Sequence, residues 1–237
     1  MKVSIVLPTY NEAKNIPILI ENIEKVVLKK YPGEIIIVDD QSPDGTANIA
    51  KRLNQKYKNI KVIVKERKEG IGAALRVGYN HAKGDTIISL DADLSFNTHD
   101  INRLITKINE GCSLVVGSRY IGKGKYEKLN LKTLIKSIIS KYGNKMVKLI
   151  SGIELHDYSL NFRAIKREVW KGIKTQDNTN SILFEMIIKS KYKGYKVCEI
   201  DVVFKDRRYG KSKLNLLKEI PKFFYKLIYY SFKYKTK

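Results

Sequence analysis

Apolar residues in the first half of the chain fall into short runs, and the stretches between the runs carry apolar residues at helical spacing. The short runs predict five strands, at 2–7, 34–38, 60–65, 86–90 and 113–117. The intervening stretches predict helices over 16–27, 46–57 and 72–82. Strands that alternate with helices in this way indicate a doubly wound, mostly parallel α/β sheet.

The regular alternation stops after the fifth strand. A Gly- and Lys-containing loop at 122–128 leads to a helix over about 131–150, a mixed segment, a strand near 197–204 and a basic stretch before a last helix. We expect a catalytic domain over 1–215, which includes an interfacial helix over about 131–150. Residues 216–237 are expected to form a basic amphipathic C-terminal helix.

Polar residues follow three of the predicted strands directly. In open α/β sheets, ligands bind outside the carboxyl ends of the strands. This rule selects three loops as one site, at 8–12, 39–44 and 91–95.

Asp91 and Asp93 place two carboxylates two positions apart at one of these strand ends. Like charges this close are unfavourable unless a cation lies between them. Carboxylate oxygens suit Mg²⁺ or Mn²⁺, which complete their shells with substrate phosphates. A lone Asp-x-Asp is more often a solvated turn, but the position at a strand end favours a metal site.

Asp39 follows a run of β-branched residues at the end of the second strand. An ionised carboxylate only accepts hydrogen bonds, which suits the donor groups of a nucleotide base. Tyr10 and Glu12, on the neighbouring loop, are candidates for stacking and for a ribose contact. The alternative is that Asp39 belongs to an ordinary Asp-rich turn.

The charge of the chain changes the choice of partner. It has 46 Lys and Arg against 24 Asp and Glu, a net charge of +22, which favours polyanions such as nucleic acid, anionic lipid or phosphorylated substrates. The sequence has no helix-turn-helix, RNP or zinc-finger signature, and its acidic loops would repel nucleic-acid phosphate. We therefore expect no nucleic-acid partner.

Two further features concern the compartment. Cys112 and Cys198 lie far apart without a Cys-x-x-Cys motif, so we expect neither a disulfide framework nor a zinc site, and a reducing compartment. The N-terminal apolar run is cut short by Pro8 and is expected to be a strand rather than a signal peptide. No apolar run reaches the roughly 18 residues that a spanning helix requires, so we expect a cytoplasmic protein without a spanning helix.

Taken together, four segments resemble, in order and spacing, the inverting family 2 glycosyltransferases. They are 3–12, 38–46, 70–74 and 91–94. Three more segments are most similar to dolichyl-phosphate or polyprenyl-phosphate mannose synthases, namely 117–120, 162–167 and 206–214. The resemblance covers nearly the whole chain and implies the GT-A fold.

The resemblance also implies roles for individual residues. The guanosine of GDP-mannose would contact Pro8, Tyr10, Glu12, Ile37 and Asp39, and the rest of the nucleotide sugar would contact Asp91, Ala92, Asp93 and Lys213. Mg²⁺ or Mn²⁺ would bind Asp91, Asp93 and Ser95. The acceptor phosphate would contact Arg119, Lys136, Ser140 and Arg207. The catalytic residues would be Asp91, Asp93, Arg119 and Arg207.

Four positions depart from the family pattern. Ser95 stands where a Gln metal ligand is usual, and Lys136 stands where an Arg is usual, which loses the bidentate fork. Leu160 and Asn161 replace the Ser-Gly of the motif Asp-x-Thr-Ser-Gly-Phe-Arg. The identities of the sugar and the acceptor are therefore less firmly implied than the family.

A polyprenyl-phosphate acceptor fits the remaining features. Its phosphate is already anionic at neutral pH, so it can attack without a general base. The predicted helices at 131–150 and 216–234 combine apolar faces with lysines, as peripheral membrane helices do, and we expect the protein on the cytosolic face of a membrane. A UDP-sugar donor, a sugar-hydroxyl acceptor, undecaprenyl instead of dolichyl phosphate and a membrane-protein subunit stay open.

Overall fold

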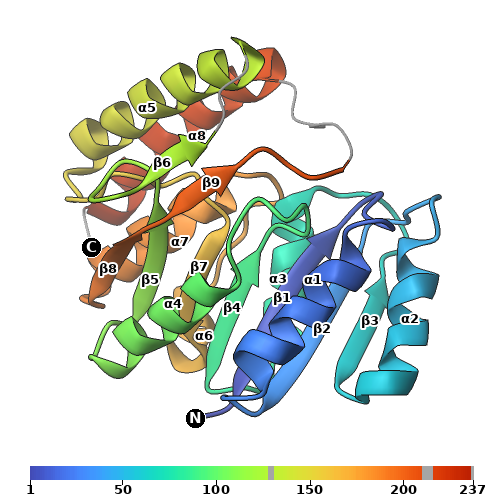
Figure 1. Ribbon diagram of the computed structural model, residues 1–237. Helices are drawn as coiled ribbons and strands as arrows, with labels where there is room; N and C mark the ends of the chain where they lie inside the picture. The colour runs from blue at the N-terminus through green and yellow to red at the C-terminus, as the bar shows by residue number, and fades with distance from the viewer. Residues whose placement is uncertain (128–130, 210–215, 236–237) are drawn as a thin grey trace.

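The computed structural model describes residues 1–127, 131–209 and 216–235 (Figure 1), apart from the side chains of 131–133, 136, 216–224 and 235. Its centre is a seven-stranded sheet in the order β3-β2-β1-β4-β7-β5-β8. Six strands are parallel to one another, and β7 runs antiparallel between β4 and β5. The strands are β1 (Val3–Thr9), β2 (Gly33–Asp39), β3 (Ile60–Val64), β4 (Thr86–Leu90), β5 (Leu114–Ser118), β7 (Phe162–Lys166) and β8 (Val197–Asp201). The predicted doubly wound, mostly parallel sheet is confirmed.

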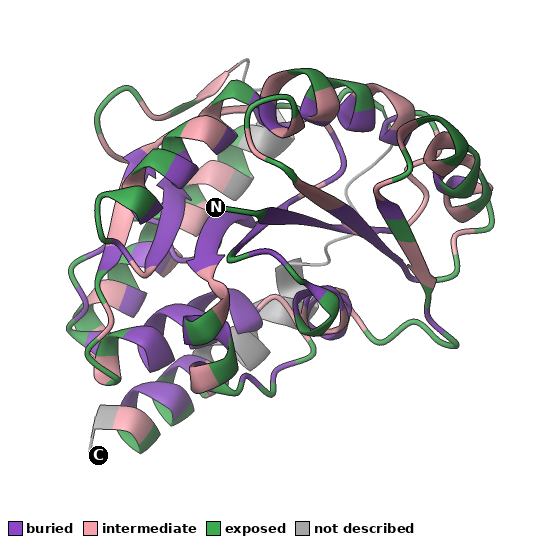
Figure 2. Cartoon of the chain, turned by 90° about the horizontal axis from the view of Figure 1, so that it is seen from below, coloured by how far each residue is buried: buried purple, intermediate pink, exposed green. Residues whose placement is uncertain are grey.

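Helices cover both faces of the sheet (Figures 1 and 2). One face carries α1 (Ile16–Ile23), which continues as the π-helix η1 (Glu24–Leu28), with α2 (Thr46–Tyr57) and α4 (His99–Asn109). The other carries α3 (Ile71–His81), α6 (Arg167–Ile173) and α7 (Ile182–Tyr192).

The central strands are apolar on both sides because both faces are covered. In β1, Val3, Ile5 and Leu7 enter the core beneath α1, whereas Val6 enters the core beneath α3. Figure 2 shows the consequence, since the central strands are coloured as buried along most of their length. This burial on both sides explains the mostly apolar runs from which the strands were predicted.

The strand predicted near 197–204 is in fact two strands in two sheets. β8 ends at Asp201, and β9 (Val203–Lys205) pairs in parallel with β6 (Lys125–Glu127). Between them, Val202 contacts both sheets: its N–H donates to the Ser118 carbonyl of β5 at 2.9 Å, and its carbonyl accepts from the Lys125 N–H of β6 at 3.3 Å.

Two long helices lie together at one end of the molecule (Figure 1). They are α5 (Leu131–Ser151) and α8 (Leu216–Lys235). Val147 of α5, and Leu227 and Tyr230 of α8, belong to the core beneath α3. Among the helices in the described ranges, none is both long and apolar enough to cross a membrane.

The expectation of two unpaired cysteines is wrong. Cys112 and Cys198 form a disulfide, with their Cα atoms 6.1 Å apart and a separation of 86 positions in the sequence. The pairing of β5 with β8 brings them together, because Cys112 precedes β5 and Cys198 lies opposite Val115. The reducing compartment inferred from unpaired cysteines therefore loses its basis.

Candidate active site

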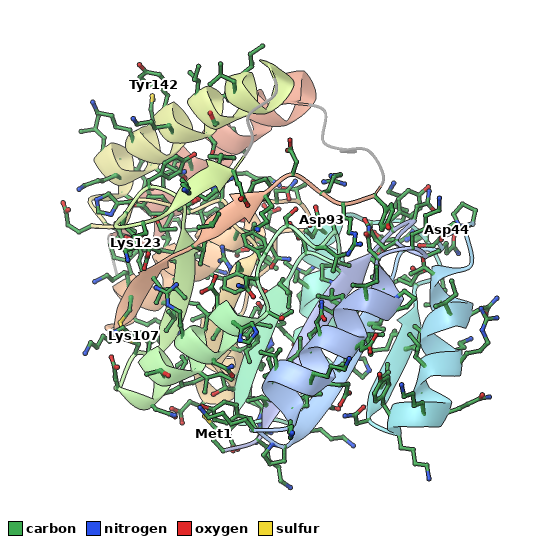
Figure 3. All side chains as sticks on the ribbon, in the orientation of Figure 1. Met1, Asp44, Asp93, Lys107, Lys123 and Tyr142 are labelled. Carbon is green, nitrogen blue, oxygen red and sulfur yellow. A yellow bond between two sulfur atoms is a disulfide. The ribbon has the colours of Figure 1, made fainter. Side chains whose placement is uncertain are left out.

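The predicted strand-end loops meet at one edge of the sheet. Asp44, after β2, and Asp93, after β4, lie at this edge in Figure 3, whereas Met1, before β1, lies at the opposite edge. Parallel strands place all their carboxyl ends on the same side. The three loops selected from the sequence are thus neighbours in the structure.

Asp39 links the first two loops. Its buried carboxylate accepts hydrogen bonds from Thr9 Oγ1 at 2.9 Å, from the Ser42 N–H at 2.7 Å and from Ser42 Oγ at 2.6 Å. A carboxylate has about four acceptor positions, so three are used within the protein. Asp39 therefore shapes the loops, and its contact with a base stays a prediction.

Side chains of the second loop also hold the backbone of the first. The Asn11 N–H donates to Ser42 Oγ at 2.8 Å, and the Glu12 N–H donates to Thr46 Oγ1 at 2.9 Å. Asn11 has a left-handed φ of 58°, a conformation that Asn tolerates better than most residues. These bonds fix the turn that carries Tyr10 and Glu12.

Two lysines beside this turn did not stand out in the sequence. Lys65 is buried and pairs with Asp40 at 2.8 Å. Lys68 Nζ lies over the Tyr10 ring, 3.6 Å from its centroid. The sequence offered no signal for either contact beyond the basic composition of 65–68.

Three other residues implied by the resemblance have clear positions. Ile37 and Ala92 are buried and belong to the core beneath α1, and Pro8 lies in β1 opposite Val38 of β2. Lys136 lies on α5 but its side chain is outside the described residues, as is all of Lys213. Their contacts with the nucleotide sugar or the acceptor stay predictions.

The two carboxylates after β4 each contact a side chain from a distant part of the sequence. Asp91 Oδ1 accepts a hydrogen bond from Asn161 Nδ2 at 2.9 Å, and Asp93 Oδ2 lies 3.2 Å from the Arg207 guanidinium. Burial, and next the Asp93 carboxylate, raise the pKa of Asp91 to about 7. Asp93 and Arg207, which the resemblance implied separately as catalytic residues, therefore lie in contact.

The donor set near Asp91 and Asp93 fits a hard divalent cation. Ser95 is completely buried, and its hydroxyl has no hydrogen-bond partner among the described residues. Its N–H donates to Asp93 Oδ1 at 3.1 Å, which keeps it close to that carboxylate. No cluster of three or more His, Cys, Asp or Glu side chains suited to a metal occurs in the described part of the chain. A bound Mg²⁺ or Mn²⁺ would thus need oxygens from a substrate as well.

A chain of buried hydrogen bonds orients Asp91 from the core. Tyr79 OH donates to Ser89 Oγ at 2.7 Å, Ser89 Oγ donates to Asn161 Oδ1 at 2.7 Å, and Asn161 Nδ2 points to Asp91. Because the Ser89 hydroxyl donates to Asn161 Oδ1, the NH2 group of the Asn161 side chain faces Asp91. The sequence identified Asn161 only as a departure from the family pattern.

Arg119 is the centre of a second cluster. It forms a two-point pair with the buried Asp157, with Nε to Oδ2 at 2.7 Å, and it also donates to Tyr126 OH, Ser140 Oγ and Ser159 Oγ. The predicted neighbours Arg119 and Ser140 therefore meet, at 3.2 Å. Asp157 completes the cluster, although the sequence left its role open.

The loop 157–161 connects the two clusters. Its first residue binds Arg119, and its last residue binds Asp91. This loop thus joins the Asp91 cluster to the Arg119 cluster, which includes Ser140 of α5. Lys213 and the Lys136 side chain cannot be added to it, because they lie outside the described residues.

Comparison with known proteins agrees with this geometry. A dolichol-phosphate mannosyltransferase from Pyrococcus furiosus is 37% identical over 217 residues, which are 90% of this chain. The chain spans only 59% of that relative's length. A polyprenol monophosphomannose synthase from Mycolicibacterium smegmatis is 28% identical over 89% of this chain and 80% of its own length.

Solved structures support the GT-A fold. Glucosyl-3-phosphoglycerate synthase from Mycobacterium tuberculosis, in complex with Mn²⁺, UDP-glucose and phosphoglyceric acid, has a TM-score of 0.69 over 98% of this chain and 79% of its own, at 17% identity. The same enzyme has also been solved with Mg²⁺ and UDP, again with a TM-score of 0.69. The model of the glycosyl transferase family 2 matches residues 4–173. With the strand-end carboxylates, the sheet order and this match in agreement, the chain belongs to glycosyl transferase family 2.

Proposed function

We propose that the protein transfers mannose from GDP-mannose to a polyprenyl phosphate at a membrane surface. One observation carries the choice of acceptor. Of the thirteen exposed large apolar side chains among the described residues, ten lie on α5 and α8, and Ser140 of α5 is bonded to Arg119 in the site. A helix with an apolar outer face thus contacts the reaction centre directly.

The acceptor in this proposal is a phosphate rather than a sugar hydroxyl. A hydroxyl needs a base, whereas in this proposal Asp91 and Asp93 are ligands of the cation and Asp157 is paired with Arg119. A phosphate monoester is largely dianionic at neutral pH and needs no base. The names of the two mannosyl-transferring relatives also support a lipid phosphate acceptor and a mannose donor.

In the proposed reaction, a phosphate oxygen of the acceptor attacks C1 of mannose opposite the diphosphate. The new C1–O bond forms as the bond to the GDP oxygen breaks, so the configuration at C1 inverts. Asp91, Asp93 and Ser95 would hold Mg²⁺ or Mn²⁺, which neutralises charge on the leaving diphosphate. Arg207 would hold the incoming phosphate, and Arg119 would position Ser140 and the loop 157–161 around it.

The proposed location is peripheral, on the cytosolic face of a membrane, with α5 and α8 against the lipid. Exposed apolar residues together with a net charge of +22 suit an anionic bilayer. We also propose that 1–215 form the catalytic domain and that the 216–237 helix adds to its membrane face.

Two labelled donors test the choice of sugar. Purified protein is incubated with a polyprenyl phosphate, Mg²⁺ and either GDP-mannose or UDP-glucose, and label is counted in the lipid phase. We expect lipid-linked mannose and no lipid-linked glucose. A product only with UDP-glucose favours the second candidate, a UDP-sugar-dependent transferase of the same family.

A further inference from the structure

A basic cavity lies between α6, α7 and α8, away from the site described above. Its volume is about 420 Å³, and four of its lining residues are lysines, with Tyr192 and Tyr234 beside them. The lysines are Lys174, Lys189, Lys193 and Lys233, and no acidic residue lines the cavity. Ligand cavities usually measure roughly 300–1,000 Å³, so it can hold a small anion with its attached group.

The general basicity of the protein does not account for this cavity. A second cavity of similar size, about 410 Å³, is lined by Asp85 and Glu168 as well as by Lys166 and Arg167. It has two acidic and two basic side chains in its lining, although it lies in the same chain. The concentration of positive charge is therefore specific to the cavity beside α8.

One lysine of the cavity is buried and held in place by hydrogen bonds. Lys189 is 4% exposed, binds Glu185 at 2.7 Å and donates to the Lys174 carbonyl at 2.8 Å. Lys174 takes a left-handed φ of 44°, an uncommon conformation for a residue other than Gly. Because Glu185 neutralises Lys189 alone, the other three ammonium groups leave the cavity strongly positive.

The cavity also opens at the border of the apolar face of α8. Tyr225, Ile228, Tyr229 and Phe232 are exposed along one side of that helix, whereas Tyr230 and Ser231 are buried on the other. Lys233 lies between these two sides, and its ammonium donates to Tyr229 OH at 2.5 Å. A group bound there would lie at the level where lipid headgroups begin when the apolar face enters a bilayer.

We infer that this cavity binds the phosphate-containing headgroup of an anionic phospholipid. The inference rests on the proposed membrane location, and it adds a lipid site separate from the acceptor site. Lysine ammonium groups bind phosphate as compact charges, and Tyr192 and Tyr234 flank the space with partly apolar rings.

The test compares two double variants with the same loss of charge. Lys174→Gln/Lys193→Gln alters the cavity, and Lys141→Gln/Lys145→Gln removes two exposed lysines from α5. Binding of dihexanoyl phosphatidylglycerol, kept below its micelle concentration, is measured by calorimetry, with dihexanoyl phosphatidylcholine as the neutral lipid. One lysine near an anionic group contributes about a fivefold effect, so we expect at least tenfold weaker binding for the cavity variant and less than twofold for the α5 variant.

Three outcomes would overturn the inference. Equal losses of lipid affinity in both variants would indicate that the net positive charge of the protein, and not the cavity, attracts the lipid. Equal binding of both lipids by the wild type would exclude recognition of the anionic headgroup. Competition by inorganic phosphate or glycerol phosphate at the affinity of the lipid would assign the cavity to a soluble phosphate compound instead.

A separate activity assay distinguishes failure of this inference from failure of the proposed function. Both variants and the wild type are assayed for mannose transfer to a short-chain polyprenyl phosphate in detergent without phospholipid. We expect all three to be equally active. If the wild type transfers no sugar, the proposed function fails, whereas the lipid-binding result for the cavity still decides the inference.

Discussion

At the scale of single residues, Asp91 links the stability of the fold to the proposed metal site. Its pKa of about 7 lies above the ordinary value of 3.8. A carboxyl with a raised pKa stabilises the folded state most below pH 4, and that contribution is lost as the pH rises to 7. In EDTA, we expect the free energy of unfolding of the wild type to fall over this range, and Asp91→Asn to be roughly 2 kcal/mol more stable than the wild type at pH 8.

Urea unfolding at pH 5 and pH 8 measures this effect. Parallel pH dependences for the wild type and Asp91→Asn would contradict a raised pKa. With Mg²⁺ and GDP added, the order should reverse, because only the wild type can bind the cation through both carboxylates.

Substitution of the two arginines of the site is expected to affect different properties, stability for Arg119 and transfer rate for Arg207. Arg119 is 9% exposed and paired with the buried Asp157, whereas Arg207 is 30% exposed. Removing one member of a buried pair costs about 3–5 kcal/mol, so Arg119→Ala should lower thermal stability. Arg207→Ala should keep the wild-type melting temperature and lose about 10²–10³ in transfer rate. Melting curves and initial rates test this. A lower melting temperature only in Arg207→Ala, with a rate loss only in Arg119→Ala, would contradict the assignment.

Asn161 is expected to position Asp91. Asn161→Leu removes the donor to Asp91 Oδ1, and Ser89→Ala only releases the amide that holds it. We expect Mn²⁺ affinity in the GDP complex to fall about tenfold in Asn161→Leu and less in Ser89→Ala, since a hydrogen bond to a charged group contributes about 1.5–3 kcal/mol. Calorimetric titration checks this, and unchanged Mn²⁺ affinity in both variants would make the chain of hydrogen bonds purely structural.

At the scale of elements, the apolar face of α5 is expected to hold the protein on lipid. Tyr142 is 66% exposed and Leu149 is 81% exposed. Tyr142→Glu/Leu149→Glu should reduce flotation with anionic liposomes at least tenfold, because each buried apolar side chain contributes about 1.5–3 kcal/mol. Val64→Glu, at a 45% exposed position on β3, is the control, and an equal loss in that variant would remove α5 from the membrane contact.

Sequence patterns correctly predicted the strands that are buried on both faces of the sheet. β1, β2 and β4 are buried on both faces, so their sequences are mostly apolar, and Ser4 in β1 and Ser89 in β4 are buried as well. The loops after these strands meet at one edge of the sheet, as predicted. β7 was missed because Arg163 and Lys166 interrupt its apolar character. Arg163 is nevertheless fully buried, with its guanidinium bound to the carbonyls of Leu160 and Leu183.

The contacts inside the site were harder to predict than its position. Asn161 meets Asp91 only because β7 lies antiparallel beside β4, and no local pattern encodes that pairing. The same holds for Arg119 and Asp157, which are 38 residues apart. Sequence motifs therefore selected most of the candidate groups of the site, and tertiary pairing determined which of them contact one another.

At the scale of the whole molecule, the Cys112–Cys198 disulfide closes a long loop across the sheet. Next to Cys198, Glu199 accepts hydrogen bonds from the N–H groups of His156 and Asp157 at 2.8 and 3.0 Å. A crosslink over 86 residues typically contributes about 2–4 kcal/mol. We expect a reducing agent to lower the melting temperature of the wild type but not that of Cys112→Ala/Cys198→Ala. Equal melting temperatures of the wild type with and without reductant would show that the crosslink adds no stability.

The central claim is that the nucleophile is a lipid phosphate. The most direct measurement supplies labelled GDP-mannose and Mg²⁺ with either a polyprenyl phosphate or the matching polyprenol, and follows the lipid product by mass spectrometry and by the configuration at C1. The account predicts a mannosyl phosphodiester with inverted configuration from the phosphate, and no product from the polyprenol. Transfer to the polyprenol at a comparable rate, or a product with retained configuration, would contradict it.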